Sequence, residues 1–354
     1  MRPICVYPGS FDPPTYGHLR VVEKAAELFP SLTVVCSVNE GKPGRWFSPE
    51  EAKRLWRAYP LPAGVRVLTL ADFLAAHPDP EAIVMVRGVR NEADAEAEKL
   101  VMLDNRARFG IARFLYLFDE AVRDVSSTRT RQAARNLDWD GIGRCVAPLA
   151  ASALLEKTLG LTNLCLVVGP PGGGKSTFMR RLAALDPANV HVDTDRFLDE
   201  LKPEIFRRFA GEDHCRVALD REAELLAFVA PLWLAKLRAA VAAAPAGANL
   251  FIEAAYALQA DKELFRKVGG KIVYVDCGGK GENCRRIRGR GTPQHLPFVE
   301  RIPGWERTRE IAAEHRLLVE RVDTSGGEAG LDRLAAEFHA RLKGGMLWNA
   351  CSWR

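Results

Sequence analysis

The sequence contains few cysteines and no close cysteine pair. Its eight cysteines, among 354 residues, include no C-x-x-C spacing of the kind that binds metals or exchanges disulfides. Cys5, Cys36 and Cys165 lie in apolar, strand-like runs, where a free thiol behaves as a small hydrophobic side chain. This pattern is typical of a reducing compartment, and we expect a cytoplasmic protein.

An apolar leader and a long uncharged helix are also missing. Residues 1–3 lead directly into a short strand and a glycine turn, without the apolar core of a signal peptide. The most apolar helical stretch, residues 227–244, is interrupted by Lys236 and Arg238. The sequence therefore predicts neither secretion nor a membrane span.

No large excess of charge of one sign is present. Fifty lysines and arginines face 45 aspartates and glutamates, which gives a formal net charge of +5 with no strong bias in either half. This balance gives no reason to expect a nucleic-acid-binding surface. Hydrophobic residues at 47% and charged residues at 27% exclude a disordered or collagen-like chain.

Short apolar runs alternate with longer amphipathic ones along the chain. The expected strands of the first part are residues 4–7, 32–38, 65–70, 83–86 and 114–118. A second series comprises residues 164–168, 190–192, 250–253 and 271–276, with a long helical region at 216–244 and a last helix at 331–342. The alternation predicts an N-terminal doubly wound parallel-sheet α/β domain over residues 1–158, a second α/β domain over 162–343 and a tail at 344–354.

The first strand runs into a motif at residues 7–18, Y-P-G-S-F-D-P-P-T-Y-G-H. Gly9 and Gly17 let backbone N–H groups approach a phosphate, and the start of a helix adds partial positive charge. His18 stands at that helix start, where it can donate to a phosphoryl oxygen that gains charge. The alternative is a simple strand–turn–helix junction capped by Thr15. The whole run closely resembles the nucleotidyltransferase signature T-x-G-H, in the form found in bacterial phosphopantetheine adenylyltransferases.

Further segments match that family in the same order. Residues 39–51 resemble the loop that carries its substrate-binding lysine, here Lys42, although this loop is one residue longer. Residues 87–90 correspond to R-G-[LIV]-R, and Asp94 and Glu98 fall at its acidic helix positions. Residues 125–131 resemble I-S-S-[ST]-x-x-[RK], which caps a helix and meets the triphosphate. The resemblance covers about residues 1–158, but the family's aromatic F-E-Y-E segment reads A-E-A-E here.

The resemblance implies a reaction. The phosphate of 4'-phosphopantetheine attacks the α-phosphorus of Mg-ATP, releases pyrophosphate and forms dephospho-CoA, a displacement that depends on positioning and charge neutralisation. His18 is the implied catalytic residue. The implied ATP-binding residues are Ser10, Phe11, His18, Gly88, Val89, Arg90, Glu98, Val125, Ser126, Ser127 and Thr128. The implied acceptor-binding residues are Ser10, Lys42, Leu74 and Arg87.

The second domain opens with a glycine-rich loop between a strand and a helix. Residues 169–177 read G-P-P-G-G-G-K-S-T and match the Walker A pattern G-x-x-x-x-G-K-[ST]. In such a loop backbone amides cradle a β-phosphate, Lys175 reaches the β/γ oxygens as a catalytic residue, and Ser176 binds Mg²⁺. The expected ATP-binding residues here are Gly169, Gly172, Gly173, Gly174, Lys175, Ser176, Thr177, Arg286 and Arg290.

Acidic residues follow two later strands of this domain. Asp193 and Asp195 are candidate catalytic groups that orient an acceptor hydroxyl or a metal-bound water, with a helix cap as the alternative. Glu253 ends the next strand and is expected to hold Mg²⁺ with Ser176, unless it forms a surface ion pair. The four arginines of residues 285–290 resemble a kinase lid, and a solvated helix end is their alternative.

Three functions remain open from the sequence. The first is transfer of an adenylyl group to 4'-phosphopantetheine, joined to a P-loop kinase that acts on dephospho-CoA or another small molecule. The second is a nicotinamide mononucleotide adenylyltransferase fused to a ribosylnicotinamide kinase. Residues 7–13 and 87–90 favour the 4'-phosphopantetheine enzyme over this alternative. The third makes the P-loop domain a non-catalytic ATP sensor. We expect ATP, the acceptor and further copies of the chain as partners, and neither nucleic acid nor membrane.

Overall fold

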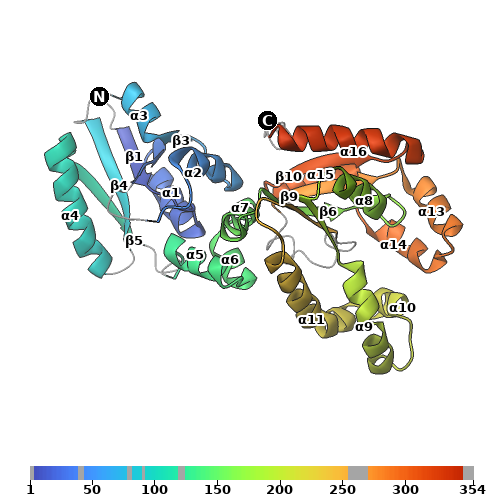
Figure 1. Cartoon of the computed structure of the whole chain (residues 1–354). Helices are drawn as coiled ribbons and strands as arrows, with labels where there is room; N and C mark the ends of the chain where they lie inside the picture. The colour runs from blue at the N-terminus through green and yellow to red at the C-terminus, as the bar shows by residue number, and fades with distance from the viewer. Residues whose placement is uncertain are drawn as a thin grey trace. The chain divides into compact units, whose positions relative to one another are not determined.

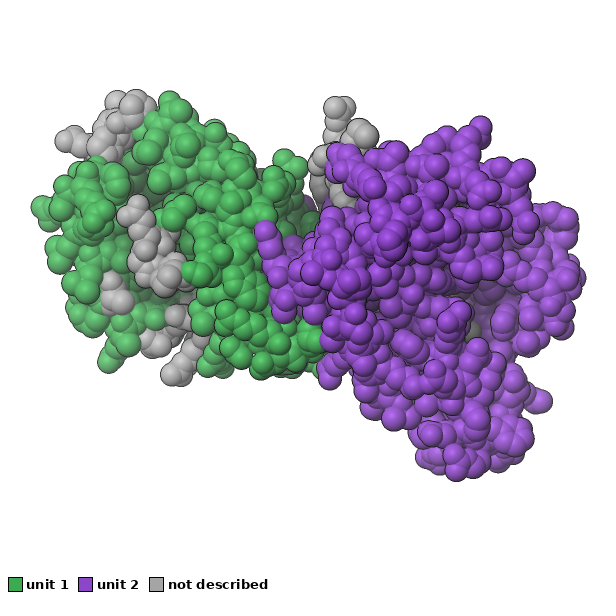
Figure 2. Space-filling model, in the orientation of Figure 1, with its two compact units in different colours: residues 1–150 green, residues 151–354 purple. Residues whose placement is uncertain are grey.

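The computed structural model describes residues 4–38, 44–77, 82–89, 92–118, 124–253 and 270–345 (Figure 1). The chain divides into two compact units, residues 1–150 and 151–354 (Figure 2). The division falls inside helix α7 (Pro148–Leu159), whereas the sequence places the boundary after that helix, at 158–162. Each unit contains its own parallel five-stranded sheet, which confirms the predicted α/β class.

The strand order of the first unit creates a ligand-binding edge. Its strands are β1 (Ile4–Gly9), β2 (Leu32–Cys36), β3 (Val65–Thr69), β4 (Ile83–Val89) and β5 (Arg113–Phe118). They lie in the order β3-β2-β1-β4-β5, so the chain builds outward on one side of β1 and then crosses to its other side. Parallel sheets of this kind bind ligands outside the carboxyl ends of the strands, at the point where the order reverses. That point is the end of β1.

The helices of the first unit connect these strands, and the core lies between them and the sheet. They are α1 (Tyr16–Leu28), α2 (Pro49–Leu55), η1 (Trp56–Ala58), α3 (Leu70–Ala76), α4 (Glu92–Phe109), α5 (Ser127–Arg135) and α6 (Trp139–Cys145). Strand residues Val6 and Val35 pack against Phe73 of α3 in a buried apolar cluster. Burial of such side chains stabilises the fold by about 25 cal/mol per Å² of apolar surface.

The second unit places its glycine-rich loop after the central strand. Its strands are β6 (Asn163–Val168), β7 (Asn189–Asp193), β8 (Asn249–Glu253), β9 (Lys271–Asp276) and β10 (Leu318–Asp323), in the order β10-β9-β6-β8-β7. Every residue of β6 is buried, as expected for a parallel strand covered on both faces. The sequence does not predict β10, because its polar residues Glu320 and Arg321 interrupt the apolar run.

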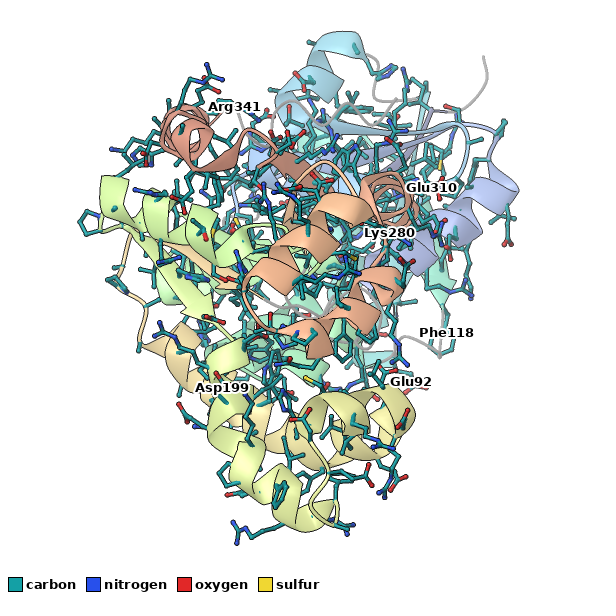
Figure 3. All side chains as sticks on the ribbon, turned by 90° about the vertical axis from the view of Figure 1, so that its right-hand side faces the viewer. Glu92, Phe118, Asp199, Lys280, Glu310 and Arg341 are labelled. Carbon is teal, nitrogen blue, oxygen red and sulfur yellow. The ribbon has the colours of Figure 1, made fainter. Side chains whose placement is uncertain are left out.

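Helices of the second unit are more numerous than the sequence predicts. They are α8 (Lys175–Leu185), α9 (Asp195–Arg208), α10 (His214–Asp220), α11 (Glu222–Ala242), α13 (Lys280–Gly289), η4 (Pro293–His295), α14 (Leu296–Arg301), α15 (Trp305–Glu314) and α16 (Gly327–Lys343). The single helical region expected over 216–244 is two helices, α10 and α11, separated at Arg221. Charged side chains such as Lys280 and Glu310 lie on the solvent-facing sides of these helices (Figure 3).

Helix α11 is a long apolar helix of the second unit. It has 21 residues, and by length and composition it is long and apolar enough to cross a membrane, with 22% of its most apolar window buried. Leu225 and Val229 pack in a cluster with Leu201 and Ile205 of α9, while Leu232 is exposed. One such helix is weak evidence for a membrane span, since core helices pass the same test.

Three asparagines form a ladder across the second sheet at the amino ends of its strands. The Asn163 amide donates to Asn249 at 2.8 Å, and Asn249 donates to Asn189 at 3.0 Å. Asn189 in turn donates to the Leu182 carbonyl at 3.0 Å. Because the three residues occupy paired register positions on β6, β8 and β7, the ladder holds that register with buried polar groups.

Candidate functional site

A capping arrangement fixes His18 at the start of α1. The Thr15 backbone N–H donates to His18 Nδ1 at 3.0 Å, and the Thr15 hydroxyl oxygen accepts from the His18 backbone N–H at 3.4 Å. Since Nδ1 is an acceptor in this geometry, a neutral ring carries its proton on Nε2. The cap therefore sets both the orientation and the tautomer of the predicted catalytic histidine.

Phe11 supports the same ring from the side. It packs edge-on against His18 at 5.1 Å between ring centroids, and also against Tyr7 and Trp56. Its side chain is 2% exposed, so only the backbone of Phe11 could contact a ligand directly. Its φ of +42° lies in the left-handed region, which turns the chain sharply between β1 and α1.

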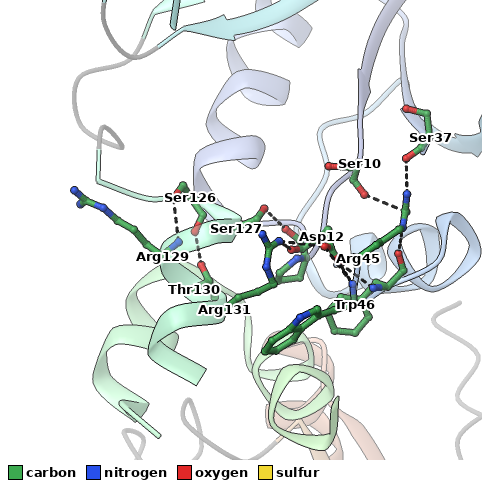
Figure 4. A network of polar contacts seen from close by, with 12 residues as sticks. Ser10, Asp12, Ser37, Arg45, Trp46, Ser126, Ser127, Arg129, Thr130 and Arg131 are labelled. Atoms are coloured by element: carbon green, nitrogen blue, oxygen red, sulfur yellow. Dashed lines mark hydrogen bonds and ion pairs between the residues drawn. The ribbon is translucent and has the colours of Figure 1, made fainter. Parts of the chain in front are cut away.

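Asp12 connects this turn to two distant segments (Figure 4). Its buried carboxylate accepts the backbone N–H groups of Trp46 at 3.1 Å and Phe47 at 2.8 Å. It also accepts Arg131 Nη1 at 3.1 Å, and the same nitrogen contacts the main-chain carbonyl of Asp12. Hydrogen bonds to an ionised group are about twice as strong as neutral ones. Asp12 thus fixes loop 44–48 and helix α5 relative to the motif.

The start of α5 is the second predicted phosphate-contacting segment, and it lies beside the start of α1. The Ser126 hydroxyl caps α5 by accepting the Arg129 N–H at 3.3 Å, and Ser127 donates to the Pro13 carbonyl at 2.8 Å. A Cβ on Gly17 would lie 3.0 Å from the Val125 carbonyl, so this close approach requires glycine. Two helix N-termini therefore meet at one edge of the sheet, an arrangement that favours anionic ligands.

Arg87 and Glu98, two predicted ligand-binding residues, bind each other. Arg87 Nε and Nη2 donate to the two Glu98 oxygens at 2.6 and 2.7 Å, and Nη1 donates to the Pro8 carbonyl at 2.8 Å. Burial alone would lower the pKa of Arg87, but the hydrogen bonds and charge of Glu98 raise it. Together with the contact to Pro8, the pair fixes the carboxyl end of β4 to β1.

Arg45 was not predicted, and the fold places it at the same edge. Its guanidinium donates to the carbonyls of Ser37 at 2.9 Å and Ser10 at 3.4 Å, and Nε contacts the Phe47 carbonyl (Figure 4). The aromatic ring of Trp46, the next residue, lies 5.3 Å below the Arg135 guanidinium. The sequence signal for both is the longer loop, which differs from the family pattern at this point.

The remaining residues predicted for the first unit fall into three groups. Gly88 and Val89 end β4, where a Cβ on Gly88 would lie 2.7 Å from Val21 of α1. Thr128 is exposed in the first turn of α5, and Leu74 of α3 is 50% exposed. Lys42 and Arg90 lie outside the described residues.

In the second unit the glycines of the P-loop form a cradle that side chains would fill. A Cβ on Gly169 would lie 2.0 Å from the Val275 carbonyl, and one on Gly174 would lie 2.9 Å from the Thr324 hydroxyl. A Cβ on Gly172 would lie 2.7 Å from the Asn283 carbonyl, and one on Gly173 would lie 2.8 Å from the Val275 carbonyl. Gly174 has a φ of +93° and is the last residue of the loop, directly before α8 begins at Lys175. These close approaches exclude a side chain at the four glycine positions of the loop.

Lys175, Ser176 and Glu253 come together beside this cradle. Lys175 Nζ donates to the Gly169 carbonyl at 3.0 Å and lies 4.0 Å from Glu253. The Ser176 hydroxyl donates to Glu253 at 2.9 Å, and His191 Nε2 contacts the other carboxylate oxygen at 2.9 Å. Burial would raise the pKa of Glu253, but the hydrogen bond from His191 and the charge of Lys175 lower it. Glu253 is therefore ionised and, with Ser176, offers the hard oxygen ligands that Mg²⁺ prefers.

The predicted acidic residues Asp193 and Asp195 lie at the end of β7, next to Glu253 in the sheet. Asp193 is paired with Glu253 in the β7–β8 register, and its carboxylate accepts the Asp195 N–H at 3.0 Å. Although Asp195 is exposed at the surface, the protein packed around its carboxyl raises its pKa to about 6. The charge of Lys175 lowers this pKa and that of Glu253 raises it. A carboxyl with this pKa can accept a proton near neutral pH.

The two predicted lid arginines differ in their surroundings. Arg286 donates to the Thr324 carbonyl at 3.0 Å and to Glu282 at 2.8 Å, and Thr324 donates to the Gly173 carbonyl at 2.7 Å. Arg286 therefore lies one residue away from the P-loop. Arg290 caps the end of α13 and is exposed. Thr177, the remaining predicted residue, is in the first turn of α8.

A cavity of about 480 Å³ lies between α9 and the loop before α10. At its rim Asp213, His214 and Cys215 bring three potential metal-ligand atoms within 4.8 Å of one another. Asp213 already caps α10 through the Cys215 N–H at 2.9 Å. Burial raises the pKa of the Cys215 thiol to about 11, which favours the protonated thiol and a structural role.

Comparison with known proteins agrees with the geometry of the first unit. The cytidylyltransferase-like family matches residues 6–133. The phosphopantetheine adenylyltransferase of Corynebacterium efficiens is 36% identical over 137 residues, which cover 38% of this chain and 85% of that protein. The enzyme of the same name from Bifidobacterium longum is 33% identical over 160 residues, covering 44% and 96%.

Among solved structures, that of the NadR protein in complex with NR covers 96% of both chains at 16% identity, with a TM-score of 0.32. The two sequence relatives each match less than half of this chain. Through that unit, the chain belongs to the cytidylyltransferase-like nucleotidyltransferases, as a relative of the bacterial phosphopantetheine adenylyltransferases.

Proposed function

We propose that the first unit transfers the adenylyl group of ATP to 4'-phosphopantetheine, giving dephospho-CoA and pyrophosphate. The observation that carries this proposal is the capped His18. It lies at the carboxyl edge of the sheet, within the motif at residues 7–18 that resembles the relatives' family. Two helix N-termini beside it supply partial positive charge for phosphate groups. The activity named for the relatives supplies the acceptor.

In the proposed reaction an oxygen of the acceptor phosphate attacks the α-phosphorus of ATP. The bond from the α-phosphorus to the bridging oxygen breaks, and pyrophosphate leaves with that oxygen. His18 donates from Nε2 to a phosphate oxygen as charge develops there, while Ser10 and Lys42 hold the acceptor phosphate. Removing one such donor costs about 3 kcal/mol of barrier, or 10²–10³ in rate.

We propose that the second unit is a kinase for a small molecule with a hydroxyl group, and that dephospho-CoA is the first acceptor to test. The P-loop cradle and Lys175 would bind the ATP phosphates, and Ser176 and Glu253 would hold Mg²⁺. When bound, that ion would neutralise charge on the β- and γ-phosphates. Asp195 would accept the proton of the acceptor hydroxyl as its oxygen bonds to the γ-phosphorus and ADP leaves.

Pyrophosphate release from ATP tests the first proposal, with 4'-phosphopantetheine and nicotinamide mononucleotide as separate acceptors. We expect release with 4'-phosphopantetheine and a 10²- to 10³-fold loss in His18→Ala. Release only with the mononucleotide, or a His18→Ala variant as active as wild type, contradicts it.

Conversion of dephospho-CoA to CoA tests the second proposal. Lys175→Ala should abolish this step and leave pyrophosphate release intact, because the two reactions use different units. ATP hydrolysis without phosphorylation of dephospho-CoA would point to another acceptor. ATP binding without any turnover would make the second unit a sensor.

A further inference from the structure

Arg45 is held at the ligand-binding edge by neutral groups alone. Its three hydrogen-bond partners are the backbone carbonyls of Ser10, Ser37 and Phe47, and no carboxylate pairs with it among the described residues. Other arginines of this edge are neutralised: Arg87 by Glu98 and Arg131 by Asp12. The half-buried Arg45 thus carries a positive charge that no carboxylate within the described ranges neutralises.

The Arg45 guanidinium lies at the carboxyl ends of two strands. Ser10 follows β1 and Ser37 follows β2, so the guanidinium bridges the carboxyl ends of neighbouring strands. Burial raises the pKa of the Cys36 thiol, the last residue of β2, to about 12, and the charge of Arg45 acts against this rise. Arg45 therefore lies close to the carboxyl ends of both strands.

The geometry also leaves hydrogen-bonding capacity on Arg45. A guanidinium has five N–H donors, and the three carbonyls accept three of them, which leaves two. These two donors are on Nη1 and Nη2, the pair that binds phosphate in a bidentate manner. A rigidly held, unneutralised guanidinium is suited to an anion and poorly suited to a neutral group.

We propose that Arg45 binds the phosphate of the acceptor in the adenylyl-transfer reaction. This inference rests on the proposed function of the first unit, and it assigns the role to a residue outside the matched motifs. The acceptor phosphate is favoured over ATP because Arg45 contacts Ser10 and the β2 end, whereas the two helix N-termini lie on the α5 side of the motif.

Binding of two ligands that differ only by a phosphate group, measured with the full-length protein, tests the inference. Calorimetry would compare 4'-phosphopantetheine, pantetheine and ATP as ligands of wild type, Arg45→Gln and Arg45→Lys. In Arg45→Gln the Kd for 4'-phosphopantetheine should rise about 10- to 100-fold, the usual loss for a charged hydrogen bond. The affinities for pantetheine and ATP should stay within about twofold, and Arg45→Lys should lose less than Arg45→Gln.

Arg108→Gln is the matched control, because it removes one positive charge from an exposed pair with Asp104 on α4. It should leave all three affinities unchanged. An equal loss for pantetheine and 4'-phosphopantetheine in Arg45→Gln would make Arg45 a loop clamp and overturn the inference. A loss for ATP alone, or no loss at all, would also overturn it.

The design separates this inference from the proposed function. If wild type binds nicotinamide mononucleotide and not 4'-phosphopantetheine, the proposed acceptor is wrong, and the mononucleotide with its unphosphorylated nucleoside becomes the pair that tests Arg45. If wild type binds neither phosphorylated compound, the inference on Arg45 is overturned. Should Arg45→Gln unfold, Arg45→Lys tests the inference: it keeps the charge but not the paired Nη donors, so its affinity should still fall for 4'-phosphopantetheine alone, and no loss would overturn the inference.

Discussion

Arg131 and Asp12 are 119 residues apart in the sequence and form a buried ion pair of 3.1 Å in the first unit. The same Arg131 nitrogen also contacts the main-chain carbonyl of Asp12. Through Asp12, the pair extends to the backbone N–H groups of Trp46 and Phe47. One carboxylate therefore holds together the three segments that surround the proposed adenylyl-transfer site.

Asp12→Ala should destabilise the first unit strongly. The change leaves the Arg131 guanidinium and two backbone N–H groups without their buried acceptor, and breaking a buried pair costs about 3–5 kcal/mol. Urea unfolding of wild type and variant measures the difference in free energy. Asp124→Ala is the control, because its pair with Arg129 is exposed and should contribute at most about 1 kcal/mol. Equal effects of the two changes would contradict this account of Asp12.

Thr15→Ala should reduce adenylyl transfer by more than its effect on stability explains. The variant loses the helix cap, at a cost of about 1 kcal/mol, and the hydroxyl that contacts His18. We expect a loss in rate of about tenfold, equivalent to about 1.4 kcal/mol of barrier, and recovery in Thr15→Ser. Asp138→Ala removes the cap of α6, away from the site, and should leave the rate unchanged. A Thr15→Ala variant with wild-type rate would show that the cap does not orient His18.

Asp195 should make the stability of the second unit depend on pH. Its pKa is about 6 in the folded protein, above the ordinary value of 3.8, so the folded state binds the proton more tightly than the unfolded state. The contribution of this group therefore favours folding near pH 4 and is lost as the pH rises through 6. Asp195→Asn should accordingly unfold at a higher temperature than wild type at pH 7 and at about the same temperature at pH 4. A difference that does not vary with pH would contradict the raised pKa.

Asn249→Ala should destabilise the second unit through the groups that it leaves unpaired. The Asn163 amide N–H loses its acceptor and the Asn189 side-chain oxygen loses its donor, each at a cost of about 1–3 kcal/mol in a buried place. Chemical unfolding with a probe in the second unit measures the change. Gln294→Ala on η4 of the same unit is the control, since Gln294 is exposed and should change stability by less than about 0.5 kcal/mol. A cost below 1 kcal/mol for Asn249→Ala would mean that water replaces the lost partners.

The alternation of strands and helices could be predicted because it depends on local periodicity. β1, β2, β6 and β9 appear where apolar runs predict them, and the strand–loop–helix context of the P-loop follows in the same way. Strand β10 was not predicted, because its polar residues Glu320 and Arg321 interrupt the apolar run. An edge strand tolerates such residues. The break between α10 and α11 at Arg221 was not predicted, although Asp220, Arg221 and Glu222 interrupt the apolar pattern there.

The sequence by itself determined the two parallel-sheet units, the position of His18 after the first strand and the glycines that form the P-loop, because these depend on residues close together in the chain. Only the tertiary structure decided which charges meet. Strand order places Asp193 beside Glu253, pairs Arg87 with Glu98 and Asp12 with Arg131, and leaves Arg45 among carbonyls. The physical reason is that an ionic interaction depends on distance and burial in space, and neither is encoded in the local pattern that specifies a strand or helix.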